Sequence, residues 1–190
     1  GWDDFYYDEQ NCDYFLKKMH FHLWPVLNVC AYNLLLNHFH LIVRIKSETE
    51  IIRCSKLWCR HQRVPYRPLK PSQQFSNFFN GYAKAMNKVY ERKGSLFQRQ
   101  FKRILIDSDD YLQYVIAYVH TNAQKHNMVD DFRNWEFSSY HKILSDKPTD
   151  LLKEKVLALY NGEKNYINYH ENFLYARNVA SSKYDNFAGR

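Results

Sequence analysis

The order of predicted elements places this chain in the α+β class: a small antiparallel sheet with helices packed on one face, followed by a helical C-terminal extension. Three observations predict it. Two adjacent apolar, β-prone runs lie at 26–36 and 38–45, amphipathic helical patterns flank them, and further helical patterns close the chain. We expect a first domain over residues 1–145 and the extension over residues 146–190.

The elements are justified in chain order by periodicity and by the residues that end them. Pro25 stops the first helical pattern, and Asn37 suits a tight connection between two strands. Residues 47–71 have no clear assignment, apart from a proline-rich loop at their end. The predicted elements are a helix at 10–22, strands at 26–36 and 38–45, a helix at 73–93, a strand at 95–106, a helix from 109 to about 125, a short helix within 135–144, and helices at 149–161 and 165–177.

Capping residues support the helices of the second half. Ser72 and Ser108 are expected as N-caps, and Asp109 and Asp110 complement the helix dipole in the first turn that follows Ser108. Glycines are expected to end two of the helices, at Gly94 and Gly162.

Composition indicates a folded, basic protein with an acidic partner. Hydrophobic residues make up 45% and aromatic residues 17% of the 190 positions, and the net charge is +7. Sixteen Tyr and thirteen Phe beside twenty-seven Lys and Arg are typical of proteins that bind single-stranded nucleic acid. No apolar run is long enough to span a membrane, and four cysteines without a secretory leader favour the cytoplasm. Cys54, Cys59 and His61 lack the spacing and the fourth ligand of a zinc site.

Two histidine pairs have the spacing H-x-H, and only one of them is expected to converge on a metal. Side chains at i and i+2 of a strand lie on the same face, whereas in a helix they diverge by about 200°. His38 and His40 belong to a predicted strand, so both can reach one ion. His20 and His22 fall at the end of a predicted helix and are expected to form a surface pair near its C-terminus.

A second group of polar residues lies on the predicted helix that begins near residue 109. Tyr118 and Asn122 are four residues apart and share a face of that helix. A phenol is a possible nucleophile and an amide oxygen a possible ligand for a hard cation. Tyr111 and Tyr114 share parts of the same surface, and spacing alone does not single out Tyr118.

Four stretches, in order along the chain, resemble the motifs of one family. They are "NHFHLIV", "GSLFQRQFKR", "DYLQYVIAYVHTNAQKHNMV" and "WEFSSY". These stretches are similar to the single-tyrosine HUH transposases, and within them to the REP-associated tyrosine transposases, relatives of the smallest insertion-sequence transposases. The match is co-linear over about three-quarters of the chain, and several motifs in a shared order are more specific than any one of them.

The resemblance implies a fold, a reaction and a set of site residues. His38, His40 and Asn122 would hold a Mg²⁺ or Mn²⁺ ion, and Tyr118 would cleave and rejoin single-stranded DNA through a 5′-phosphotyrosine. It also implies a ferredoxin-like or RRM-like sheet, DNA partners with hairpin ends, a monomer or homodimer, and a prokaryotic cytoplasm with the protein on the nucleoid when DNA-bound. Charge alone suggests phosphate contacts at Lys84, Lys88, Arg92, Arg99, Lys102 and Arg103.

The chain departs from the family pattern at three places. The family opens with a strand of the type Y-H-x-x-N-R-g, and we expect this chain, which begins "GWDDFYYDEQ", to lack it. Ala123 replaces the proline that follows the asparagine, and Leu36 replaces a proline before the first histidine.

Two other functions stay open from the sequence. One is a non-catalytic module on the same fold that binds single-stranded DNA or RNA by stacking and phosphate contacts. The other is a structural protein in which both histidine pairs are incidental. An enzyme would need Tyr118 and a divalent ion, and neither alternative would.

Overall fold

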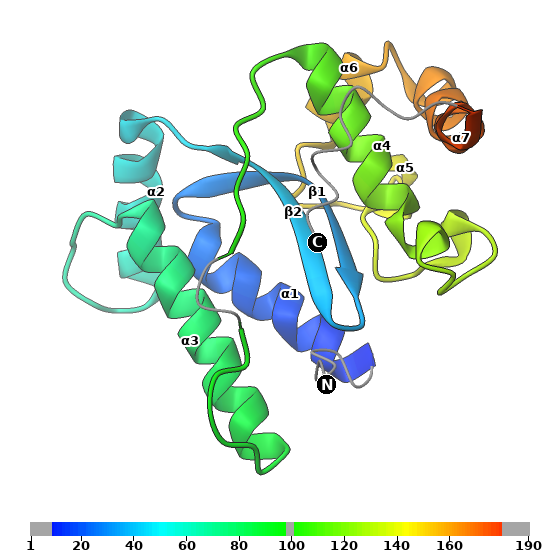
Figure 1. Cartoon of the computed structure of the whole chain (residues 1–190). Coiled ribbons are helices and arrows are strands. Elements are labelled where there is room, and N and C mark those ends of the chain that lie inside the picture. The colour runs from blue at the N-terminus through cyan, green and yellow to red at the C-terminus, as the bar shows by residue number, and fades with distance from the viewer. Residues whose placement is uncertain (1–8, 98–100, 180–190) are drawn as a thin grey trace. The chain divides into compact units, whose positions relative to one another are not determined.

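The computed structural model describes residues 9–97 and 101–179, with side chains placed up to residue 174. It confirms the α+β class: the described residues form a two-stranded antiparallel sheet, packed helices and a helical C-terminal part (Figure 1). The elements are α1 (Glu9–Leu23), β1 (Leu27–Leu35), β2 (His38–Ile45), α2 (Glu48–His61), α3 (Pro71–Val89), α4 (Asp109–Lys125), the 3₁₀ turn η1 (Phe132–Asn134), α5 (Tyr140–Leu144), α6 (Lys153–Leu159) and α7 (Glu163–Val179).

The chain divides into two compact units. The first unit comprises residues 1–30 and 34–105, and the second comprises 31–33 and 106–190. We expected the C-terminal extension to begin at residue 146, and the residues on both sides of that boundary belong to the second unit. The middle of β1 therefore contributes three residues to the unit that otherwise consists of the C-terminal half.

Aromatic side chains form the core of the first unit. Phe15 of α1 is 1% exposed, and its ring lies 4.9–5.1 Å from the rings of Phe39, Phe78 and Tyr82. Helices α1 and α3 pack together through these rings. Phe39 belongs to β2, so the same cluster attaches the strand that carries the H-x-H motif to both helices.

Helix α4 is the centre of the second unit. Every residue from Val115 to Ala123 is buried, which is more than one helical stripe, and α4 packs against α7 and η1. Ser108 caps it as expected, because its hydroxyl accepts a hydrogen bond from the Tyr111 amide at 3.3 Å. At the start of α7, Gly162 has φ +111°, a conformation that glycine tolerates and other residues rarely adopt.

Several predicted elements differ in the structure. Residues 48–61, which had no assignment, form α2. Pro71, and not Ser72, begins α3, because the fixed φ of proline suits the first helical position. Helix α3 also ends five residues before Gly94, where Glu91 takes a left-handed φ of +50°.

The predicted strand at 95–106 is wrong in the residues that the structure describes. Residues 101–106 have no regular structure and pair with neither β1 nor β2. Leu105 is 84% exposed, so the apolar positions of this segment do not form a buried face. Alternation predicts a strand only where a neighbouring strand supplies hydrogen bonds and a core covers one face.

Candidate functional site

His38 and His40 lie side by side at the start of β2. Both side chains are half-buried, and their ring centroids are 5.1 Å apart with the ring planes perpendicular. Phe39 between them packs against Phe15. This is the arrangement expected of a strand, in which alternate side chains point to opposite faces.

A neighbouring amide determines which nitrogen of His38 carries the proton. His38 Nδ1 lies 2.8 Å from Asn37 Oδ1, and because an amide oxygen only accepts, Nδ1 must donate. In the neutral ring Nε2 then carries the lone pair, which is the form that binds metal ions. Metal-binding histidines commonly have such a partner on the second nitrogen.

The ring separation of the pair is compatible with one shared metal ion, as the resemblance implies. Two imidazoles bound to one ion at an angle near 90°, with metal–nitrogen distances of about 2.1 Å, have centroids about 5 Å apart. The observed 5.1 Å agrees. Across the described residues, however, no three His, Cys, Asp or Glu side chains gather at a possible metal site, so further ligands would have to be of another type.

Tyr118 and Asn122 lie on α4 and belong to the second unit, whereas the histidine pair belongs to the first. Tyr118 is 3% exposed and Asn122 is 1% exposed. The Lys125 ammonium lies over the Tyr118 ring, 5.4 Å from its centroid. Each half of the expected site is therefore held by its own compact unit.

A buried chain of hydrogen bonds holds the side of α4 opposite to Tyr118. His170 Nδ1 donates to the Tyr166 carbonyl (2.7 Å), so His170 Nε2 can accept from His120 Nδ1 at 2.9 Å. His120 Nε2 then accepts from the Ser139 hydroxyl at 2.8 Å. Ser139 in turn accepts from the Tyr32 amide at 2.8 Å, so the chain runs from α7 through α4 to β1.

Burial keeps both histidines of this chain neutral. Desolvation lowers the pKa of His170 to about 4, although the Tyr166 carbonyl opposes the shift. Burial, and then the nearby His170, lower the pKa of His120 well below its usual value. The sequence did not predict this cluster, since His120 and His170 are fifty positions apart. It anchors α4 at the residue midway between Tyr118 and Asn122.

The other histidine pair lacks the geometry of the first. His20 is exposed and its ring lies tilted against that of Trp24, with a centroid distance of 6.3 Å, and His22 is half-buried against Phe21. Burial, with a smaller contribution from the positive charge of Lys18, lowers the pKa of His22. Both histidines lie in the last turn of α1, as expected, but only His20 is a surface residue.

The cations expected to contact DNA are partly accessible. Lys84 and Lys88 are exposed on α3, Lys102 and Arg103 are exposed in the irregular segment, and Arg92 is half-buried. Arg99 lies outside the described residues.

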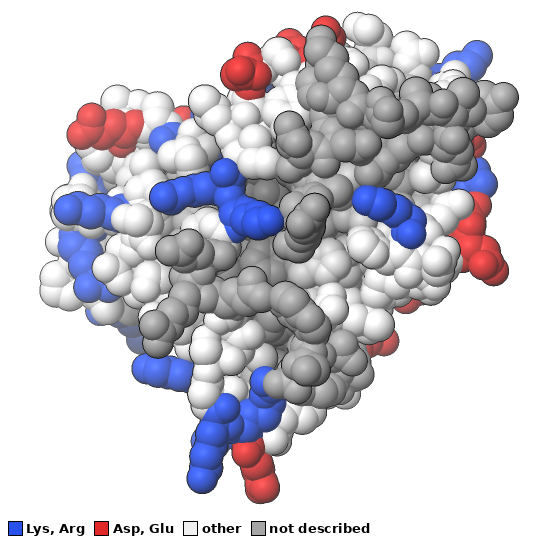
Figure 2. Space-filling view, in the orientation of Figure 1, with Lys and Arg blue, Asp and Glu red and all other residues white. Residues whose placement is uncertain are grey.

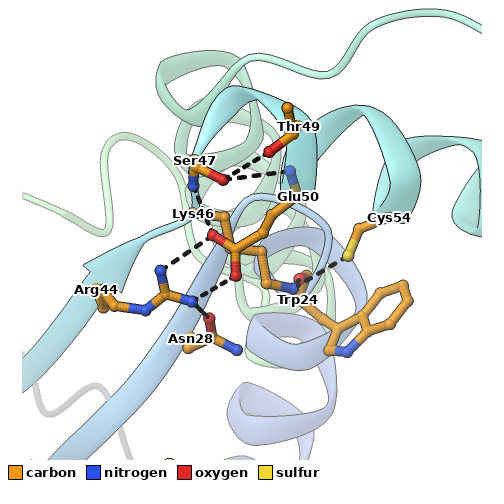
Figure 3. A network of polar contacts seen from close by, with 8 residues as sticks. All are labelled: Trp24, Asn28, Arg44, Lys46, Ser47, Thr49, Glu50 and Cys54. Atoms are coloured by element: carbon orange, nitrogen blue, oxygen red, sulfur yellow. Dashed lines mark hydrogen bonds and ion pairs between the residues drawn. The ribbon is translucent and has the colours of Figure 1, made fainter.

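A polar network joins β2 to α2 (Figure 3). Arg44 donates to both carboxylate oxygens of Glu50, at 2.8 and 3.0 Å, and to Asn28 Oδ1 at 2.6 Å. The Ser47 hydroxyl accepts from the Glu50 amide while the Glu50 carboxylate accepts from the Ser47 amide, which is a capping box. The Arg44 hydrogen bonds, followed by those from Ser47, hold the pKa of Glu50 far below its usual value.

The buried Lys46 adds a second link in the same network. Lys46 is 7% exposed, and its ammonium donates to the Trp24 carbonyl and lies 3.5 Å from the sulfur of Cys54 in α2. The strand with the histidine pair and helix α2 are therefore fixed to each other by hydrogen bonds at two points.

The positive charge of the protein belongs to the first unit. Seventeen of the 27 Lys and Arg residues but only 8 of the 20 Asp and Glu residues lie there, which gives formal charges of +9 for the first unit and −2 for the second. A polyanion would therefore be attracted to the unit that carries the histidine pair.

Comparison with known proteins supports the resemblance. The chain is 25% identical over 106 residues to a Haemophilus influenzae protein described as a "putative REP-associated tyrosine transposase". The matched region covers 56% of this chain and 54% of that relative, so the chain spans about half the length of the relative. No protein family profile and no solved structure matches. No helix among the described residues is long and apolar enough to cross a membrane.

Proposed function

We propose that the protein is a metal-dependent transposase that cleaves and rejoins single-stranded DNA with hairpin ends through a 5′-phosphotyrosine on Tyr118. The observation that carries the proposal is the His38–His40 pair. The ring separation of these two imidazoles is compatible with one shared ion, and Asn37 fixes the tautomer of His38. The similarity to a protein described as a transposase and the +9 charge of the same unit support it.

The reaction assigns a role to each site residue. His38, His40 and the Asn122 amide would hold Mg²⁺ or Mn²⁺, which when bound would stabilise negative charge on the scissile phosphate. The Tyr118 oxygen attacks phosphorus, the bond from phosphorus to the 3′ oxygen breaks, and the phenol proton ends on the released 3′-OH. The reverse attack by the 3′-OH of another strand frees Tyr118 and joins the strands without ATP.

The buried position of Tyr118 adds a requirement. At 3% exposure its hydroxyl must become accessible before a phosphate can reach it. The His120–His170 hydrogen bonds hold the opposite side of α4 in place. They would therefore keep Tyr118 and Asn122 on the same face of an intact helix while the Tyr118 hydroxyl becomes accessible.

The test is covalent capture on labelled single strands that carry hairpins. With Mn²⁺ we expect a retarded band on a denaturing gel, its loss with EDTA, and its loss in Tyr118→Phe. Tyr114→Phe, on the same helix, is the matched control and should keep the band. A band that persists in Tyr118→Phe would contradict the assignment of the nucleophile.

A non-catalytic module that binds single-stranded nucleic acid is the second candidate. The burial of Tyr118 and the concentration of charge in the first unit favour it. Tight binding without any covalent band, across varied hairpins and both metals, would establish this function and contradict the first.

A further inference from the structure

The forty residues between Glu50 and Glu91 contain no Asp or Glu, and this is the longest stretch of the sequence without an acidic residue. Eight Lys and Arg occur in this stretch, and six of them lie on α2 or in the loop that connects it to α3. Figure 2 shows Lys and Arg side chains gathered over α2 and the following loop, at the left edge of the view. None of the six cations expected above to bind DNA lies on α2.

The cations of α2 lie on one narrow face. At about 100° per residue, Arg53, Lys56 and Arg60 fall within about 60° of one another, and all three are exposed. The buried Cys54 and Cys59 lie outside this face, on either side of it. We call Arg53, Lys56, Arg60 and the following Arg63 the basic face of α2. In the part of the chain that the structure describes, none of these four forms an ion pair with a carboxylate.

Like charges at these spacings destabilise a helix, so structure alone gives no reason for them. The cations near the C-terminal end complement the dipole, but Arg53 lies in the second turn, where it does not. A polyanion would remove this repulsion. The basic face extends about 10 Å along the helix from Arg53 to Arg60, about three nucleotide steps at the 3.4 Å rise of a DNA strand.

Arg63 gives an independent argument. It occupies the position after the helix end where the chain turns left-handed, with φ +54°, and the Val64 amide bonds back to the Cys59 carbonyl at 3.0 Å. Glycine is the favoured residue in this helix-ending motif because a Cβ is strained there. Arg63 is therefore a cation at a position where the backbone conformation favours glycine.

An exposed aromatic ring stands beside the basic face. Tyr66 is 48% exposed in the loop after α2, and the Lys56 ammonium lies over its ring at 5.8 Å from the centroid. A cation next to an accessible ring is the combination that binds a phosphate and stacks an unpaired base. This favours a single strand over a duplex, whose bases are already stacked.

From these observations we infer that the basic face of α2, together with Tyr66, is a binding surface for single-stranded DNA in addition to the six cations considered above. The inference rests on the single-stranded substrate of the proposed function. The network of Arg44, Glu50 and Lys46 fixes α2 on β2, so strand and helix would hold a bound DNA in one orientation relative to the histidine pair.

The test measures binding of the full chain to a labelled thirty-nucleotide oligo(dT) by fluorescence anisotropy between 50 and 300 mM NaCl. The basic-face variant is Arg53→Gln/Lys56→Gln/Arg60→Gln. The control, Lys147→Gln/Lys155→Gln/Lys164→Gln, removes the same charge from exposed sites of the second unit. We expect the basic-face variant to bind about 10- to 100-fold more weakly near 0.1 M salt, with a salt slope reduced by about 2. The control should stay within about threefold of wild type, as no direct phosphate contact is lost.

Single substitutions at two positions separate binding from folding. Arg63→Gly relieves the left-handed strain, so it should unfold at the same or a higher temperature than wild type while binding about fivefold more weakly. Tyr66→Ala should weaken binding about tenfold, and Tyr66→Phe, which keeps the ring, should not.

The outcomes distinguish this inference from the proposed function. If the basic-face variant binds like the control, the α2 surface is refuted, whatever the covalent assay shows. If the basic-face variant loses binding while the wild type forms no covalent adduct on hairpin DNA, the α2 binding surface is supported and the proposed transposase reaction is refuted. Failure of the wild type to bind any single strand would overturn both.

Discussion

Acid should destabilise the second unit through its buried histidines. His170 is neutral in the folded state, where burial lowers its pKa to about 4, against 6.5 in the unfolded chain. Between these values the unfolded state binds more protons than the folded state, so stability is complete above pH 6.5 and is lost as the pH falls towards 4. The difference of about 2.5 between the folded and unfolded pKa values of His170 corresponds to at most about 3 kcal/mol in the free energy of unfolding. This is a large part of the 5–15 kcal/mol that a typical domain has in total. His120, whose pKa is also lowered, acts in the same direction.

Thermal unfolding followed by circular dichroism at pH 7, 6, 5 and 4 measures this effect. For a chain of this size about 3 kcal/mol corresponds to a fall of about 6–12 °C in Tm. Because acid also protonates carboxylates, the fall in Tm of the wild type is compared with that of His170→Gln. This variant should have a lower Tm at pH 7, but its Tm should fall less between pH 7 and pH 4. His61→Gln, at an exposed histidine, should follow the wild type. Equal losses in His170→Gln and wild type would refute the reasoning.

Three further predictions concern the first unit. Phe15→Ala should lower the free energy of unfolding in urea by about 3–5 kcal/mol, because Phe15 joins three other rings in the core; a loss below about 1 kcal/mol would contradict this packing. Ser47→Ala should cost about 1 kcal/mol by removing the capping box of α2, whereas Ser72→Ala, within the first turn of α3, should cost less in the same urea experiment. Isothermal titration with Mn²⁺ should show weaker binding in His38→Ala than in His22→Ala, and equal affinities would remove the metal role from the β2 pair.

The hairpin and α4 could be predicted because local pattern determines them. The second strand begins at His38 and ends at Ile45, as the sequence indicated, since an alternating apolar run next to another such run has a partner available. Ser108 and the two aspartates after it mark the start of α4 in the same local way.

The errors have physical causes too. Helix α2 had no assignment, although Ser47 and Glu50 have the spacing of a capping box. Its large apolar residues Ile52 and Leu57 are exposed and its buried positions hold the small Cys54, Ser55 and Cys59, so the large apolar residues do not mark the buried face. Residues 95–106 alternate like a strand, but alternation does not supply a pairing partner.

The site was predictable in one half only. The H-x-H spacing on a strand was sufficient to predict that His38 and His40 lie on one face. Helical spacing put Tyr118 and Asn122 together, but only the resemblance gave them roles. The chain from His170 through His120 to Ser139 could not be predicted, because its three side chains come from distant parts of the sequence and meet only through tertiary packing.

The most direct test of the central claim is peptide mapping of the protein–DNA adduct by mass spectrometry. After incubation with hairpin single strands and Mn²⁺, nuclease and trypsin digestion yields one peptide, residues 104–125, that contains Tyr111, Tyr114 and Tyr118. Fragmentation of this peptide should place the nucleotide on Tyr118. A nucleotide on any other tyrosine, or no modified peptide at all, would contradict the assignment of Tyr118 as the nucleophile.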